Sequence, residues 1–222
     1  MINNELLAEA AKVCQDKAAL LPDISQIQNK AEDVCPVAWA QQIVDIAYQN
    51  NCGRSIPCRD GLWQLKAIMD AITSGSGSGE DLDLLADILD YMNKVGCEFV
   101  KKAAALVAES LRLYADEWDK HARMKRCSAL QCPAYYAVYI DPSLCVGCGT
   151  CVKNAPQGAI EGAAGKISMV RDDTALKGDF AAVCPKGAIK RYSPSGVKPR
   201  VPETLTDVGA FEAAGSRRRR RG

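Results

Sequence analysis

The feature that most limits how this chain can fold is its set of eleven cysteines in 222 residues. The first twenty residues contain acids and lysine where a signal peptide would have a continuous apolar core, so we expect no export signal and a cytoplasmic location. In a reducing compartment, cysteines serve as metal ligands rather than as disulfide partners. The sequence therefore predicts a protein that is organised partly around metal centres.

Charge and hydropathy exclude two classes of protein. The chain has 28 Lys and Arg against 27 Asp and Glu, a formal charge of +1, whereas a nucleic-acid-binding protein carries a strong basic excess. No apolar run approaches the roughly 18 residues that a membrane-spanning helix needs. We therefore expect that the protein neither binds nucleic acid nor contains a membrane-spanning helix.

The spacing of apolar residues changes about halfway along the chain. Up to His121 the spacing is helical, and Ser74–Gly79 reads as a flexible linker between helices. After His121 short β-type runs separated by glycines replace it. The sequence predicts an α+β fold, with an N-terminal helical bundle followed by a small α+β domain. The expected helices cover residues 3–20, 36–49, 60–72, 80–94 and 98–120, and the expected strands lie near 135–140, 159–161, 166–170 and 188–192.

The strongest motif is a run of three cysteines, Cys145-x2-Cys148-x2-Cys151. Such a run wraps a tight loop around one iron–sulfur cluster and supplies three thiolates, and a remote Cys followed by Pro supplies the fourth. Here the remote residue is Cys184, which precedes a proline. Structural zinc is the alternative, but zinc sites usually use paired Cys-x2-Cys knuckles. The spacing therefore predicts one [4Fe–4S] cluster.

An internal repeat supports this interpretation, because residues 155–160 match residues 184–189 at an offset of 29. Bacterial-type ferredoxins are duplicated in this way, and the sequence resembles such domains over about residues 136–192. The resemblance implies a ferredoxin-like domain of βαββαβ type. One full set of ligands is present, so the domain is expected to hold a single cluster. The positions equivalent to the missing ligands hold Ala155, Thr174, Lys177 and Phe180.

A second group of cysteines lies in the helical half, in the loop Cys52-Gly-Arg-Ser55-Ile-Pro-Cys58-Arg-Asp-Gly61. This loop resembles the C-G-x-C-x-P-C-R-x-G loop in the flavoprotein, NADH-binding subunit of respiratory complex I and its hydrogenase relatives. In that family the loop gives three cysteines to a [4Fe–4S] cluster, and a fourth follows in a helical bundle. Cys97 lies at that place. The resemblance implies a second iron–sulfur cluster, held here by Cys52, Cys58 and Cys97.

The loop departs from the family at Ser55, where a cysteine is expected. Oxygen is a harder and less suitable ligand for such iron than thiolate. The cluster could therefore be [4Fe–4S] with Ser55 or solvent on the fourth iron, a three-iron species, or absent, which would leave ordinary buried thiols. Cys14 has no evident partner in the sequence, and we expect it to be a buried free thiol.

A third group surrounds His121, the only histidine of the chain, and has the spacing His121-x5-Cys127-x4-Cys132. A histidine near two cysteines between two domains suggests structural zinc, and a tetrahedral site needs one more ligand. Cys35 is the candidate, since it opens the helix that leads to the Cys52 loop. The alternative is that His121 caps the long helix and the cysteines simply pack.

The order of these motifs resembles the NADH-binding subunits of multimeric iron hydrogenases over about residues 35–192. Those subunits have a matching cysteine, a helical cluster domain, an R-C-P-A-x-x-C-like segment and an I-D-P-x-x-C-x-x-C ferredoxin start. The resemblance implies that zinc held by Cys35, His121, Cys127 and Cys132 staples the domain junction. The expected segments are an N-terminal extension (1–34), an iron–sulfur bundle (35–121), a zinc-stapled junction (122–135), a ferredoxin domain (136–192) and a flexible tail (193–222).

The family subunits carry FMN and NADH on a larger N-terminal portion, and we find no dinucleotide fingerprint, P-loop, or acid–base or nucleophile arrangement here. We therefore expect no catalytic residues and no flavin or NAD on this chain. The resemblance implies an electron-transfer subunit of an NAD(P)H-linked oxidoreductase, either simple or electron-bifurcating. It would pass electrons between a partner flavoprotein and a soluble ferredoxin or another subunit.

Two other functions stay open at this point. The chain could be a scaffold or adaptor that zinc holds together, with iron–sulfur clusters that stabilise the fold and transfer no electrons. Alternatively, the corner near Ser55 could leave an open iron that binds substrate.

Overall fold

A computed structural model describes residues 14–211 of the chain. The chain divides into two compact units, Met1–Ala134 (unit 1) and Tyr135–Gly222 (unit 2), each of which is considered by itself. Within the described residues, no helix combines the length and the apolar character needed to cross a bilayer.

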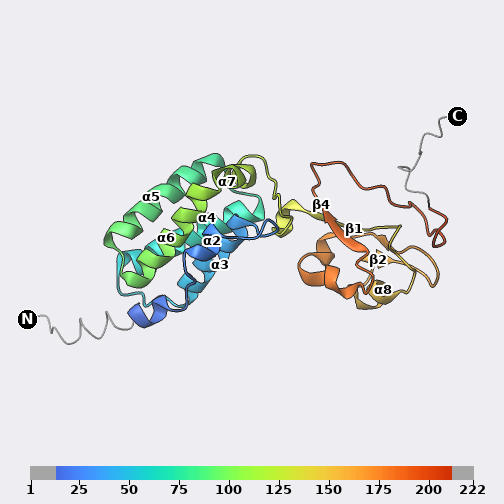
Figure 1. The fold of residues 1–222 in the computed structure, drawn as a ribbon, viewed down its shortest axis with the longest axis horizontal. Helices are drawn as coiled ribbons and strands as arrows, with labels where there is room; N and C mark the ends of the chain where they lie inside the picture. Colours follow the sequence, from blue (N-terminus) through green and yellow to red (C-terminus); the bar gives the residue numbers. More distant parts are fainter. Residues whose placement is uncertain (1–13, 212–222) are drawn as a thin grey trace, which may run out of the picture. The chain divides into compact units, whose positions relative to one another are not determined.

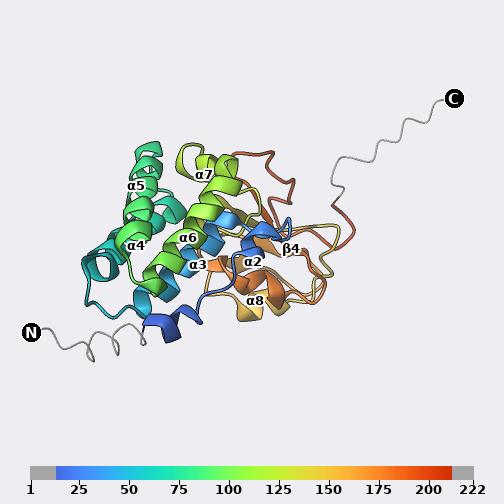
Figure 2. The ribbon, with the colours of Figure 1, turned by 60° about the vertical axis from the view of Figure 1, so that its left-hand side comes forward.

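Unit 1 is a bundle of helices (Figures 1 and 2). Residues 14–18 are helical, and the preceding part of the expected 3–20 helix lies outside the described residues. The bundle packs α5 on α6 and α3 on both α4 and α6. Its elements are α2 (Ser25–Gln28), α3 (Pro36–Gln49), a π-helical turn η1 (Pro57–Gly61), α4 (Leu62–Ser74), α5 (Gly79–Val95), α6 (Glu98–Leu113) and α7 (Ala115–Ala122).

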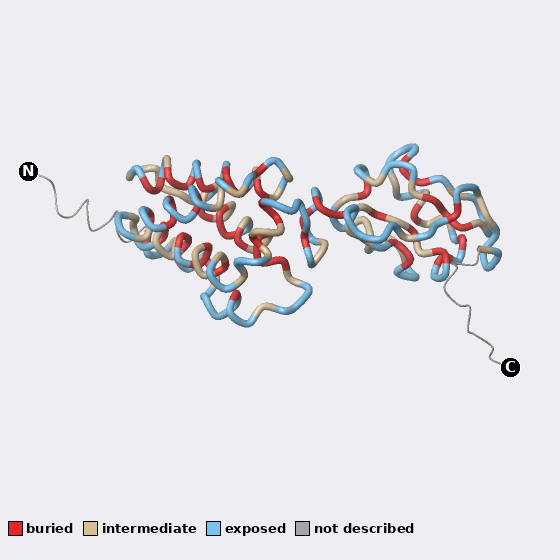
Figure 3. The backbone as a smooth tube through the Cα atoms, turned by 90° about the horizontal axis from the view of Figure 1, so that it is seen from above, coloured by how far each residue is buried: buried red, intermediate tan, exposed pale blue. Residues whose placement is uncertain are grey.

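The core of unit 1 forms where apolar residues recur at helical spacing. Buried patches repeat along each helix in Figure 3, because one stripe of each helix faces its neighbours. On α4 the residues Leu62, Leu65, Met69 and Ile72, which recur at helical spacing, are completely buried, whereas on α5 Leu82 is only half-buried. Fully buried side chains of the core include Val37, Val44, Leu62, Leu65, Met69, Ile72, Leu85, Met92, Val100 and Val107.

The prediction of one continuous helix over residues 98–120 is wrong, because the helix breaks at Tyr114. This residue has φ −125° and ψ 37°, outside the helical region, and it separates α6 from α7. Its hydroxyl donates a hydrogen bond of 2.8 Å to the Ile27 carbonyl, and Lys30 lies over its ring. These partners are distant in sequence, so local periodicity carries no sign of the break.

The Ser- and Gly-rich connection between α4 and α5 is ordered rather than a flexible linker. Ser78 and Asp81 form a capping box at the start of α5, which satisfies free N–H groups of the first turn. The Gly77 N–H donates to the Ala71 carbonyl at 2.7 Å. A Cβ at Gly77 would lie 2.8 Å from the Ile72 Cα, so a larger residue does not fit this turn.

Unit 2 contains two small antiparallel pairs of strands. β1 pairs with β4, with Ala137 opposite Tyr192 and Ile140 opposite Ile189, and β2 pairs with β3, with Ile160 opposite Val170. The α+β class is therefore confirmed. Its elements in chain order are η2 (Pro133–Tyr135, which begins in unit 1), β1 (Ala137–Ile140), α8 (Thr150–Asn154), β2 (Ile160–Glu161), β3 (Met169–Val170), the 3₁₀ helices η3 (Thr174–Leu176) and η4 (Asp179–Val183), and β4 (Ile189–Tyr192).

Unit 2 differs from the expectations in two places. Where the βαββαβ order expects a second α-helix, the chain forms the 3₁₀ helices η3 and η4. The segment after Ser193 is not wholly a free tail, since the Ile167 N–H donates to the Thr206 carbonyl at 2.8 Å and Lys166 forms an ion pair of 2.8 Å with Asp207. The final arginine run lies outside the described residues.

Candidate metal centres

The structure brings together the four residues that the sequence proposed for zinc. Ligand atoms of Cys35, His121, Cys127 and Cys132 all lie within 4.8 Å of one another, and all four residues are buried. The Cys35 Sγ lies 3.8 Å from the Cys132 Sγ and 3.4 Å from the His121 Nε2. The His121 Nε2 lies 3.3 Å from the Cys132 Sγ.

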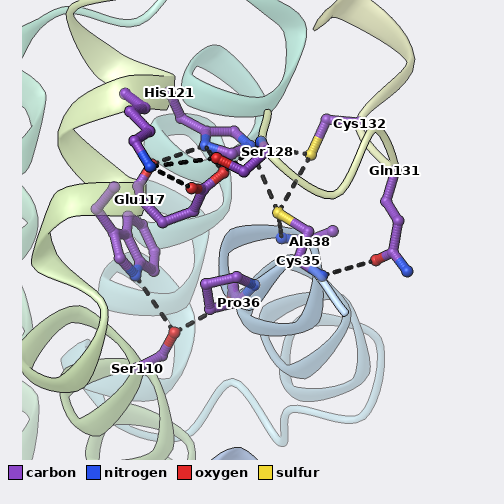
Figure 4. A network of polar contacts seen from close by, with 11 residues as sticks. Cys35, Pro36, Ala38, Ser110, Glu117, His121, Ser128, Gln131 and Cys132 are labelled. Carbon is purple, nitrogen blue, oxygen red and sulfur yellow. Dashed lines mark hydrogen bonds and ion pairs between the residues drawn. The ribbon is translucent and has the colours of Figure 1, made fainter. Parts of the chain in front are cut away.

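Three pieces of backbone position this group. Cys35 caps the N-terminus of α3, where its sulfur accepts the Ala38 N–H at 3.4 Å, and His121 lies in the last turn of α7. The loop after α7 supplies the two remaining cysteines. Gln131 joins this loop to α3, because its Oε1 accepts the Cys35 N–H at 2.9 Å (Figure 4). Its Nε2 donates to the Asp33 carbonyl at 2.7 Å.

The ring of His121 is oriented for coordination through one nitrogen. Its Nδ1 lies 2.8 Å from the Glu117 carbonyl oxygen, which can only accept, so Nδ1 carries the proton. The other nitrogen, Nε2, faces the sulfurs of Cys35 and Cys132 (Figure 4). A hydrogen bond from the second ring nitrogen to a carbonyl is the usual support of a metal-binding histidine.

The close packing of these groups shifts their pKa values strongly. Burial acts to lower the pKa of His121, but hydrogen bonds with Cys127 and Cys35 outweigh it and raise that pKa to about 10. The Cys132 and Cys35 side chains hold the pKa of Cys127 far below its ordinary value. Hydrogen bonding to Cys127 and Cys35, together with burial, raises the pKa of Cys132. Without a metal, the group therefore holds an imidazolium beside a thiolate.

These residues fit a tetrahedral zinc ion. Bond lengths of about 2.3 Å to sulfur and about 2.0 Å to nitrogen place two sulfur ligands about 3.8 Å apart and a sulfur and a nitrogen about 3.6 Å apart. The sulfur–sulfur separation of 3.8 Å between Cys35 and Cys132 matches, and the sulfur–nitrogen separations of 3.4 and 3.3 Å are slightly shorter. All four residues belong to unit 1, so the group joins the start of α3 to α7 and its following loop.

The second group consists of Cys145, Cys148, Cys151 and Cys184, which line one cavity of unit 2 with largely apolar neighbours. Cys145 and Cys151 are buried, Cys184 is half-buried and Cys148 is exposed. Four thiols around one cavity, with no acidic residue among its lining, form a donor set that suits an iron–sulfur cluster.

Local backbone geometry turns these sulfurs toward the cavity. Gly147 has φ +64°, and a Cβ there would lie 2.9 Å from the backbone of Gly165, so the loop between the first two cysteines needs glycine. The Ala188 N–H donates to the Cys184 Sγ at 3.3 Å. Hydrogen bonding with the Thr150 side chain and backbone lowers the pKa of Cys148. These contacts favour the thiolate forms that bind iron.

The third group lies in unit 1 around the loop that follows α3. The Cys52 Sγ lies 3.6 Å from the Cys58 Sγ, which also accepts the Cys52 N–H at 3.3 Å. Burial acts to raise the pKa of Cys52, but hydrogen bonds from the Arg54 backbone and the Cys58 side chain outweigh it and lower that pKa. Cys97 is the N-cap of α6, so it lies at a helix terminus that favours negative charge.

Cys14 is a buried free thiol, as expected, but it has other thiols as neighbours. Its sulfur lies 3.9 Å from the Cys52 Sγ, and its side chain also interacts with Cys97. Burial, followed by the hydrogen bond with Cys97, raises the pKa of Cys14 to about 12. Sequence spacing could not reveal this contact, because Cys14 lies outside the motif, on another segment of the chain.

Two regions of the chain match known families. Residues 38–121 match the family described as the NADH-ubiquinone oxidoreductase-F iron-sulfur binding region, and residues 138–161 match the 4Fe-4S binding domain. The first range contains the Cys52, Cys58 and Cys97 group, and the second contains the Cys-x2-Cys-x2-Cys run. The resemblance seen in the sequence is therefore confirmed for these two regions.

Parts of the chain are also similar to individual curated proteins. The chain is 33% identical over 132 residues to the NADP-reducing hydrogenase subunit HndC of Solidesulfovibrio fructosivorans, a match that covers 59% of this chain and 27% of the relative. It is 31% identical over 97 residues to the NADH-quinone oxidoreductase F subunit of Streptomyces coelicolor, a match that covers 43% of this chain and 22% of the relative. The matched part is thus about a quarter of the length of these relatives.

Proposed function

We propose that this chain is an iron–sulfur electron-transfer subunit of a multisubunit, NAD(P)H-linked oxidoreductase. The observation that carries the proposal is that each of two separately packed units contains a group of cysteines inside a region that matches an iron–sulfur family. A protein with a single structural centre would need only one such group.

Each group has its own proposed ligands. Cys145, Cys148, Cys151 and Cys184 hold one [4Fe–4S] cluster, in a unit for which we propose the ferredoxin-like arrangement on the basis of its two antiparallel strand pairs. The third group, around Cys52, holds a second cluster. When bound, such clusters supply one-electron carriers, and the polypeptide tunes their potentials through burial and hydrogen bonds to sulfur.

We propose that Cys35, His121, Cys127 and Cys132 hold a structural zinc ion. Its role is to fix the start of α3 against α7 and the following loop, because the four ligands come from those three pieces of chain. A binding energy gained only in the folded state adds to the stability of unit 1.

The proposed partners follow from the names of the relatives, both of which are subunits of NADH- or NADP-linked enzymes. We propose a flavin- and NAD(P)H-binding subunit on one side of the electron path, and a soluble ferredoxin or a further subunit on the other. The complex would be cytoplasmic and either simple or electron-bifurcating. These partners are proposals for this chain, since the match covers only part of each relative.

The test is anaerobic purification of the native complex, with measurement of iron, acid-labile sulfide and zinc and a redox titration followed by EPR. We expect about eight iron atoms, about eight sulfides and about one zinc per chain, and reversible reduction of both clusters. Protein without iron and sulfide would contradict the proposal. Clusters that stay redox-silent would instead favour a zinc-stapled scaffold, the second candidate, which the fully buried Cys and His group supports.

A further inference from the structure

The third group of thiols contains one more cysteine than the motif predicts. Cys52 and Cys58 are in sulfur–sulfur contact, and Cys14 contacts both Cys52 and Cys97. Cys14 therefore connects Cys97 to the Cys52 and Cys58 pair, so that the four thiols form one group. The set comes from three segments, namely residues 14–18, the loop after α3, and the start of α6.

The segment that carries Cys14 is held in place by contacts outside the thiol group. The Lys17 Nζ donates to the Asn50 carbonyl at 2.6 Å, two residues before Cys52. From α6, the Lys102 Nζ donates to the carbonyls of Ala18 at 3.0 Å and of Leu21 at 2.9 Å. In Figures 1 and 2 this segment lies at one end of the bundle, beside the loop that follows α3. The position of Cys14 is therefore fixed independently of its own side chain.

Ser55 has a different role from the cysteine that it replaces. Its Oγ accepts the Cys58 N–H at 3.4 Å, and its carbonyl accepts the Arg59 N–H at 2.9 Å. Both contacts serve the start of η1, as an N-cap side chain does. The hydroxyl oxygen is therefore used by the backbone, and alkoxide is in any case a poorer ligand than thiolate for such iron.

The Cys14 set, defined as Cys14, Cys52, Cys58 and Cys97, offers only thiol sulfurs, which is the donor set that an iron–sulfur cluster takes. Its close pairs, 3.6 Å between the Cys52 and Cys58 sulfurs and 3.9 Å between the Cys14 and Cys52 sulfurs, match the sulfur spacing on a single tetrahedral ion. Among the described residues, however, the group with its ligand atoms all within 4.8 Å is the Cys35 group, so the four sulfurs of the Cys14 set do not converge on one ion. Binding of a cluster would move the close pairs apart, because each thiolate then binds a different iron.

We propose that Cys14 is the fourth thiolate ligand of the iron–sulfur cluster of unit 1, in place of the cysteine that related loops carry at the position of Ser55. This inference rests on the proposed function, because it takes the cluster as present. Binding would break the Cys14 S–H bond, form one S–Fe bond and release one proton to solvent. The ligand would thus come from the N-terminal segment instead of the loop.

The test compares variants of the full chain, purified anaerobically, by iron and sulfide analysis and by EPR. For Cys14→Ala we expect iron to fall from about eight per chain to about seven or fewer, with an EPR signal of a three-iron cluster in the oxidised protein. Ser55→Ala is the matched control and should keep the wild-type iron content and spectrum. Adding Ser55→Cys to Cys14→Ala recreates the family ligand set and should restore the iron.

Each outcome separates this inference from the proposed function. Wild-type protein with no iron or sulfide contradicts the proposed function as a whole. Wild-type protein with only the unit 2 cluster contradicts the inference and the proposed second cluster, but leaves the electron-transfer role of unit 2 in place. The inference is also wrong if Cys14→Ala matches the wild type, or if Ser55→Ala loses the fourth iron. A loss of iron that comes with a loss of helical circular dichroism, and that Ser55→Cys does not restore, would show that Cys14 serves only to pack the segment.

Discussion

At the scale of residues, a thiol becomes a candidate ligand through the groups around it. Cys35 and Cys132 face the Nε2 of His121, whose other nitrogen donates to the Glu117 carbonyl. In a metal-free state the same packing keeps the imidazole protonated, since the pKa of His121 is raised to about 10. The chemistry of this group is therefore a competition between protons and a metal ion.

This competition predicts a pH dependence of zinc binding. A histidine with a raised pKa holds its proton at neutral pH, and zinc must displace that proton. Zinc affinity should therefore increase as the pH rises from about 6 to about 9, because zinc displaces the proton of His121 and also that of Cys132, whose pKa is raised as well. Titration against a chromophoric chelator at several pH values measures this. An affinity that already levels off near pH 6.5, the ordinary pKa of histidine, would contradict it.

A second prediction concerns Gln131, which holds the Cys35 N–H and the Asp33 carbonyl but contributes no ligand atom. Gln131→Ala should weaken zinc binding about 10- to 100-fold, as loss of an outer-shell partner typically does. The control is Gln64→Ala, a replacement of an exposed glutamine on α4. The same chelator titration applies, and equal affinities for the two variants would show that Gln131 does not position Cys35.

At the scale of elements, contacts between distant segments decide where helices stop and which thiols meet. At the break, the Tyr114 side chain donates a hydrogen bond to the Ile27 carbonyl. The position of residues 14–21 depends in the same way on hydrogen bonds from the Lys102 side chain to the carbonyls of Ala18 and Leu21. Each of these bonds joins a helix to a segment far away in sequence. They also attach the N-terminal part of the chain to α6.

We therefore expect Lys102→Met to release the N-terminal segment. The variant keeps the aliphatic stem but leaves the Ala18 and Leu21 carbonyls without their charged donor, so the free energy of unfolding should fall by about 1–3 kcal/mol. Hydrogen exchange should increase over residues 14–21. Lys101→Met, one residue earlier on α6, is the control. Unchanged exchange over residues 14–21 in Lys102→Met would mean that other contacts hold the segment.

At the scale of the whole molecule, the chain consists of two units with separate cores and separate groups of cysteines. Each core is built from its own elements, helices in unit 1 and paired strands in unit 2. The centres should accordingly be lost independently, because no candidate ligand set among the described residues draws on both units.

This independence can be tested by removing one ligand of unit 2. Cys145→Ala should lower the iron content by about four atoms per chain, or by about one if a three-iron cluster survives. Zinc content and the thermal transition of the helical signal should stay at the wild-type values. Val146→Ala, which changes an exposed neighbour in the same loop, serves as the control. A joint loss of zinc and iron would show that the two units depend on each other.

The sequence by itself determined the α+β class, most helix and strand positions, and the two regions that match iron–sulfur families. These features depend on local spacing, such as the apolar stripe that includes Leu62, Leu65 and Met69, or the run from Cys145 to Cys151. Local spacing can be read directly from the order of residues in the sequence. Only the tertiary structure decided the break at Tyr114, the ordered turn at Gly77 and the place of Cys14 beside Cys52. The physical reason is that these features depend on packing between segments far apart along the chain, and no periodicity records which segments will meet.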